Sequence, residues 1–143
     1  MKTKMKATLS VLFCLLCLLG LSACASNEAP VEGLWSTALF TEDAEFGSGT
    51  KTLTVAVEAG ETTVHFTVHT DKDTVGDALL EHGMIAGDES DYGLYVKVVN
   101  GITADYDVDQ SYWAFYIGDE YAMTGVDATA VEEGVNYRLV YTK

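Results

Sequence analysis

Apolar and polar residues alternate in the segments 52–58 and 62–70, which predicts two β-strands that each bury one face. Residues 59–60, Ala-Gly, form a short connection typical of a tight turn. The two strands are therefore predicted to pair as an antiparallel hairpin. The residues expected on its buried face are Leu53, Val55, Val57, Val64, Phe66 and Val68.

The next segment, 71–83, has the pattern of a short amphipathic helix. Thr74 followed by Asp77 resembles a capping box, and Gly83 suits the position just after a helix. The apolar stripe of this helix is expected to consist of Val75, Ala78, Leu79 and Leu80.

Three further strands are predicted at 93–101, 111–118 and 135–142. The first ends in Asn100-Gly101, a dipeptide typical of hairpin turns, and a turn at 118–119 follows the second. The order of strand, strand, helix and then strands predicts an α+β fold, with a β-grasp-like mixed sheet and one helix packed across it.

The N-terminal region predicts export and lipid anchoring. Residues 1–23 combine three lysines, an apolar run and small residues in the order of a secretory signal peptide. The tetrapeptide LSAC resembles the lipobox of bacterial lipoproteins, which implies cleavage before Cys24 and a diacylglycerol on its sulfur; an ordinary signal peptide is the alternative. Residues 24–50 are then the lipidated cysteine and a tether, and 51–143 the folded domain. Within 34–50, some apolar residues could pack on that domain: Trp35, Leu39 and Phe40.

The chain after the predicted cleavage site is strongly acidic. It holds all 22 acidic residues and five of the eight basic ones, which gives a formal net charge of −17. Such a surface repels nucleic acid and anionic head groups, so we expect no nucleic-acid partner and membrane contact through the lipid. The expected location is the outer face of the bacterial cell membrane. Cys14 and Cys17 fall in the signal peptide, so no disulfide is expected.

Sequence patterns of common enzymes and metal sites are missing. GxSxG, P-loop and HExxH motifs are absent, so we expect a protein that is not an enzyme and has no cofactor and no metal. His65 and His69 share a strand face, but that spacing separates them by roughly 13 Å, too far to hold one metal ion alone. Asp105, Asp107 and Asp109 alternate as in a calcium loop, but the EF-hand glycine and final glutamate are absent; solvated loop carboxylates are expected.

The aromatic run SYWAFYI at 111–117 has two interpretations. Its odd-numbered positions are Trp, Phe and Ile, as in a buried sheet face. Phe115 also lies toward the hairpin end, where an apolar side chain can contact a ligand. Tyr112 and Tyr116 face the other way and lie either under residues 34–50 or on an exposed stacking surface.

Several segments, in order, resemble the C-terminal β-domain of transcobalamin and intrinsic factor, and the transcobalamin-like C-terminal domains of bacterial surface proteins. The resemblance covers roughly residues 52–143. The matching pieces are the T-x-x-D-A-L helix start at 74–79, the turn at 99–102, the Tyr112-Trp113 pair, the turn after Gly118, Gly125-Val126, and Glu133-Gly134 before the last strand.

In that family the β-domain contacts cobalamin, a large and mostly flat corrinoid. The resemblance implies ligand contacts at Phe115, Tyr121 and Ala122, and also at Leu94 and Tyr95. Aromatic and small side chains suit the wide apolar faces of a corrin ring. The animal proteins close the ligand against a helical barrel that is not expected here, and Tyr121 stands where the family has a smaller residue or proline. A lone half-site implies weak binding or a partner that supplies the other half.

The function expected from these features is a lipid-anchored extracytoplasmic binding protein for cobalamin or another corrinoid, which delivers its ligand to a membrane transporter or shares it with a second binding domain. The first alternative is a cell-surface protein–protein or cell-wall interaction module with the same fold and no small ligand. A second alternative is a cation-binding surface built from the acidic loops.

Overall fold

The computed structural model describes residues 33–143 of the chain. The predicted signal peptide at 1–23 and the predicted lipidation site at Cys24 lie outside the described residues. None of the helices within the described part of the chain is long and apolar enough to cross a membrane.

The first predicted hairpin is confirmed. Strand β2 (Lys51–Ala59) pairs antiparallel with β3 (Thr62–Thr70), and Gly60 in the turn has a φ of +63°. All six side chains expected on the buried face are at most 2% exposed. The alternation therefore identified both the strands and the face that packs into the core.

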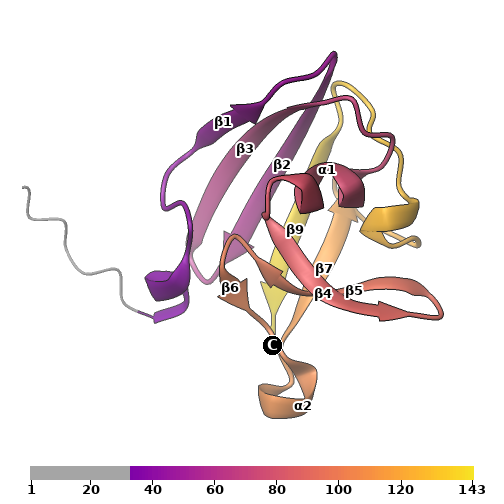
Figure 1. The fold of residues 1–143 in the computed structure, drawn as a ribbon. Helices are drawn as coiled ribbons and strands as arrows, with labels where there is room; N and C mark the ends of the chain where they lie inside the picture. The colour runs from indigo at the N-terminus through magenta and orange to yellow at the C-terminus, as the bar shows by residue number, and fades with distance from the viewer. Residues whose placement is uncertain (1–32) are drawn as a thin grey trace, which may run out of the picture. The chain divides into compact units, whose positions relative to one another are not determined.

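These two strands lie in the middle of a six-stranded mixed sheet with the order β1-β3-β2-β9-β7-β8 (Figure 1). The added strands are β1 (Ala44–Gly47), β7 (Tyr112–Ile117), β8 (Glu120–Tyr121) and β9 (Asn136–Thr142). Two pairs are parallel, β1 with β3 and β2 with β9, and the others are antiparallel. With one main helix across it, this sheet confirms the predicted α+β fold class.

Helix α1 (Val75–Glu81) is shorter than the predicted segment but begins and ends where the capping residues indicate. The Oγ1 atom of Thr74 accepts a hydrogen bond from the Asp77 N–H. At the other end, Gly83 and Met84 donate their N–H groups to the carbonyls of Leu80 and Leu79, which forms a Schellman motif. The expectation that Leu80 belongs to the buried stripe was wrong, because its side chain is 41% exposed. It lies outside the helix face that packs against the core.

The N-cap gives a prediction for stability. Replacing Thr74 with alanine removes the acceptor of the Asp77 N–H, and we expect a loss of about 1 kcal/mol in the free energy of unfolding. Thr74→Ser keeps a capping hydroxyl and serves as the control in the same urea titration. Equal stability of the two variants would show that the cap contributes nothing.

A second, three-stranded sheet lies on the same side of the large sheet as α1 (Figure 1). It contains β4 (Ile85–Ser90), β5 (Gly93–Val99) and β6 (Ile102–Thr103). The strand predicted at 93–101 is confirmed as β5, and Asn100 and Gly101 both have positive φ in the expected turn. Strand β4 was not predicted, because only its first residue is buried and its sequence does not alternate.

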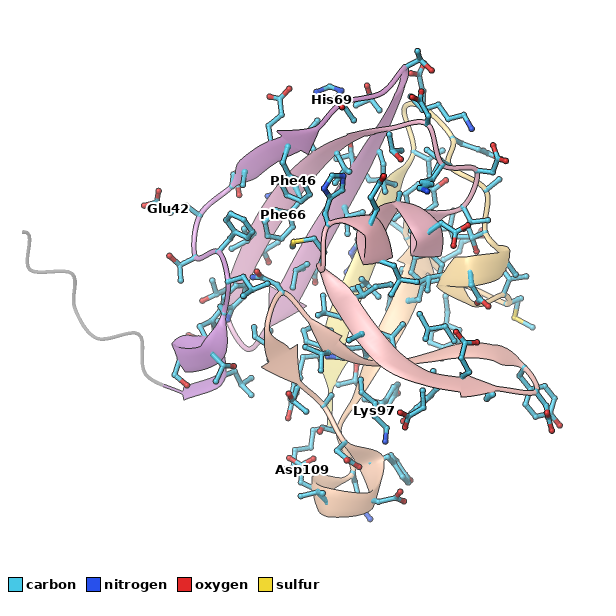
Figure 2. The ribbon with its side chains drawn as sticks, in the orientation of Figure 1. Glu42, Phe46, Phe66, His69, Lys97 and Asp109 are labelled. Atoms are coloured by element: carbon cyan, nitrogen blue, oxygen red, sulfur yellow. The ribbon has the colours of Figure 1, made fainter. Side chains whose placement is uncertain are left out.

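Part of the 34–50 segment packs on the domain, but Leu39, which was expected as one of its packing residues, is 59% exposed. Trp35, in the 3₁₀-helix η1 (Gly33–Thr37), is buried and donates its indole N–H to the Ala59 carbonyl at 2.9 Å. The buried Asn100 holds Phe40 through two hydrogen bonds, of 2.7 and 3.0 Å, to its main chain. Phe46 of β1 lies beside Phe66 of β3, with ring centroids 6.0 Å apart (Figure 2).

The acidic segment at 105–110 is not a loop, as was expected, but contains a short helix, α2 (Tyr106–Asp109). Its N-cap is Asp105, which accepts the Asp107 N–H. Asp109 bonds Ser111 and Lys143, and these contacts hold the pKa of its carboxyl below the ordinary value. Local capping by carboxylates accounts for this turn, which is labelled by Asp109 in Figure 2.

Candidate functional site

A pocket of about 280 Å³ lies between strand β5, strand β7 and the segment that follows β8. Its walls come from three parts of the chain that the fold brings together. The lining residues are Leu94, Tyr95, Val96, Tyr112, Trp113, Phe115, Tyr121, Ala122, Met123, Thr124, Gly125, Val126 and Leu139.

All five residues predicted as ligand contacts line this one pocket. Leu94 and Tyr95 come from β5, Phe115 from β7, and Tyr121 and Ala122 from β8 and its end. The Ala122 N–H donates to the Phe115 carbonyl at 2.9 Å, which holds the two chain segments side by side. The structure thus brings the five together, and their contact with a ligand stays a prediction.

Two of the aromatic residues that line the pocket, Trp113 and Phe115, are fixed by contacts inside the core. Trp113 and Phe115 are 7% and 9% exposed, so both are mainly core residues. Phe115 stacks on Tyr137 with centroids 6.1 Å apart, and the Trp113 indole N–H donates to the Ile102 carbonyl at 3.2 Å. The interpretation of Trp113 and Phe115 as part of a buried sheet face is therefore confirmed. Both residues also line the pocket, and contact of Phe115 with a ligand stays a prediction.

The rim carries exposed side chains with large apolar parts. Tyr121 is 58% exposed, Tyr95 is 42% exposed and Met123 is 95% exposed. The Tyr121 ring packs edge-on against Tyr116 at 5.5 Å, so its position is supported from the side of the sheet. A flat apolar ligand that covers this rim would bury surface that water now contacts.

Strand β1 of the 34–50 segment does not cover Tyr112 and Tyr116, but both side chains are half-buried and therefore do not form the exposed stacking surface that was the other expectation. Strand β1, within that segment, pairs with β3 at the opposite end of the sheet from β7. Tyr116 instead contacts Tyr121 and the guanidinium of Arg138, whose carbon lies 5.0 Å from the ring centroid.

The pocket is uncharged although the protein is strongly acidic, since no aspartate, glutamate, lysine or arginine is among its lining residues. Nearby charges are paired elsewhere. Lys97 bonds Asp88 at 2.8 Å, which raises the lysine pKa, and Arg138 bonds Glu58 at 2.7 Å, which raises the arginine pKa. The pocket therefore favours an apolar surface, with hydroxyl groups of tyrosine and Thr124 for orientation.

Sequence reasoning missed several lining residues. Val96 has the same strand parity as Leu94, so the alternation of β5 could have identified it. Thr124 and Gly125 lie in the connection before the 3₁₀-helix η2 (Val126–Ala128), and Leu139 comes from β9. Only tertiary packing brings these residues to the same pocket as Leu94 and Val96.

The histidines form separate pairs with carboxylates. His65 lies 3.5 Å from Asp43, and His69 lies 2.6 Å from Glu45. Figure 2 labels His69 on the side of β3 toward β1. Within residues 33–143, no group of three or more histidine, cysteine, aspartate or glutamate side chains is placed to hold a metal ion.

Comparison with known proteins gives a family and a fold. The profile of a family described as a domain of unknown function, DUF4430, matches residues 72–143. A comparison with curated proteins gives no match.

Two solved structures are similar to the chain. A candidate metal-binding protein from Ruminococcus gnavus is 32% identical with a TM-score of 0.62, and the match covers 66% of this chain and 98% of that one. Haptocorrin in complex with Cbi is 19% identical with a TM-score of 0.55, and the match covers 65% of this chain and 25% of haptocorrin. At this identity the likeness to haptocorrin shows a shared fold.

Proposed function

This chain belongs to the DUF4430 family, and we propose that it is a non-catalytic binding protein of the transcobalamin-like kind, whose pocket takes one edge of a corrinoid. The observation that carries the proposal is the uncharged pocket with an exposed tyrosine rim, lined by the five residues that the family resemblance implies. Haptocorrin, which has this fold, is solved with Cbi, a cobalamin analogue.

The size of the pocket limits how a corrinoid would bind. About 280 Å³ is at or below the small end of the range for drug-sized ligands. A corrinoid is larger, so the pocket would take one edge of the ring, and the tyrosine rim would cover part of one face. We propose weak binding by this chain alone, with a dissociation constant on the order of 1–100 μM, and tighter binding when a partner covers the other face.

The proposed biological role follows from the N-terminal sequence. A lipid on Cys24 would hold the protein at the outer face of the bacterial cell membrane. There it would capture a corrinoid and deliver it to a transporter or a second binding domain. An interaction module without a small ligand is the competing role, because an exposed apolar rim can also contact another protein.

The proposal is tested by titrating the purified protein with cobalamin and cobinamide while tryptophan fluorescence and heat are recorded. Trp113 lines the pocket. Trp35 does not, and its indole N–H donates a hydrogen bond to the Ala59 carbonyl. In a Trp35→Phe variant the remaining signal comes from Trp113 and should be quenched in a saturable way. Haem, which is flat but lacks the corrinoid side chains, is the control ligand.

The outcomes separate the two roles. Saturable quenching and heat with both corrinoids, and weaker signals with haem, would support the proposal. No saturation up to high micromolar ligand, with or without a partner domain present, would contradict it and favour the interaction module.

A further inference from the structure

One wall of the pocket comes from the β4–β5 hairpin, whose Leu94 and Val96 pack against the core but which makes few hydrogen bonds to other elements. The β4–β5 hairpin projects away from the large sheet (Figure 1), and five of the six residues of β4 are exposed. In the described part of the chain, one hydrogen bond joins residues 86–96 to a residue outside the hairpin. The Leu94 N–H donates to the Oδ2 atom of Asp127 at 3.1 Å.

Asp127 fits closely between the hairpin and its own element, η2. A Cβ atom at Gly93 would lie 2.5 Å from its Oδ2, and a Cβ at Gly125 would lie 2.8 Å from its Oδ1. Neither distance is tolerated by a real side chain. Glycine at both positions therefore leaves the space that the carboxylate occupies.

The second carboxylate oxygen of Asp127 destabilises the arrangement in which the hairpin lies close to η2. Oδ1 of Asp127 is buried and has no hydrogen-bond partner among residues 33–143. An unsatisfied buried acceptor is costly, and movement of the hairpin away from η2 would let water reach it. The bulge at Gly87, where the β4–β5 register shifts, is a natural point for that movement.

We infer that Asp127 is a positioning residue that latches the β4–β5 hairpin to η2 and so sets the width of the pocket. Through Leu94 it fixes one wall, made of Leu94 and Tyr95, relative to the opposite wall made of Phe115 and Tyr121. The expected effect of Asp127 on ligand binding rests on the proposed function, but its role in holding the hairpin to η2 does not.

Amide hydrogen exchange measured by NMR on the whole protein tests the latch without any ligand. In Asp127→Ala the Leu94 amide loses its acceptor, and its exchange should become about tenfold faster. Amides of Val57 and Leu139 in the large sheet should not change. Asp127→Asn keeps an oxygen for the Leu94 N–H and should stay within about twofold of the wild type. Asp91→Asn, at the exposed hairpin tip, makes the same charge change as a control.

Two results would overturn the latch. One is unchanged exchange at Leu94 in Asp127→Ala. The other is an equal rise at Val57 and Leu139, because this would mean general destabilisation.

Binding kinetics form the second arm of the test. Cobalamin should dissociate from Asp127→Ala about three- to tenfold faster than from the wild type, and Asp127→Asn should restore the slow rate. Faster Leu94 exchange in a protein whose wild type binds no cobalamin would support the latch and contradict the proposed function. Faster exchange with unchanged dissociation from a binding wild type would overturn the link between the latch and the pocket.

Discussion

Replacing Tyr121 with alanine is expected to weaken corrinoid binding by about tenfold, which corresponds to about 1.4 kcal/mol. Tyr121 is one of the residues that line the pocket, it is 58% exposed, and its ring packs against that of Tyr116. An aromatic side chain that is already held in place binds a flat apolar surface with little further loss of conformational entropy. Calorimetric titration of the variant with cobalamin measures the change.

Tyr106→Ala is the matched control for that experiment. Tyr106 lies on α2, is 55% exposed and does not line the pocket. It should leave binding within about twofold, and both variants should unfold at nearly the same urea concentration as the wild type, because surface truncations cost little. Equal losses of affinity in the two variants would count against the pocket.

Replacing Phe66 with alanine is expected to lower the free energy of unfolding by about 3–5 kcal/mol. Phe66 is fully buried in β3, and both Phe40 and Phe46 pack against its ring, with centroids 5.7 and 6.0 Å away. The cavity would therefore remove contacts to two other chain segments at once, those of Phe40 and Phe46. Since domains of this size are stabilised by about 5–15 kcal/mol, urea unfolding should show a large shift.

Phe40→Ala provides the comparison for Phe66. The same side chain is removed, but Phe40 is 40% exposed, so we expect a loss of only about 1 kcal/mol. If the two variants lost the same stability, Phe66 would not be the centre of this aromatic cluster.

The parts of the fold that the sequence predicted are those where burial alternates on one face. Strands β2 and β3 are such cases, and their limits were correct to within a residue. Strands β1 and β4 were missed, because one is a four-residue edge strand and the other exposes both faces. Strand β1 is paired by β3, where Ala44 lies opposite Phe66, so its partner lies outside any local window. In β4 the exposed side chains leave no apolar alternation for a local window to detect.

The candidate site was predictable for a different reason. Phe115 and Tyr121 were predicted as ligand contacts from a family resemblance. Their local sequence pattern alone fits an ordinary core strand and turn equally well. Asp127 could not be identified, because an aspartate in a polar connection is usually solvated. Its importance depends on Leu94 and Gly93, which lie more than thirty residues earlier in the chain and meet it only in the folded protein.

The most direct test of the account is a map of amide chemical-shift changes as the protein is titrated with cobalamin. Changes should gather at three places, residues 94–96, 113–115 and 121–126, which surround the pocket. Saturable changes there, with strands β1 and β3 unaffected, are the predicted result. Changes confined to β1 and β3, or none at saturating ligand, would contradict the claim that this pocket binds a corrinoid.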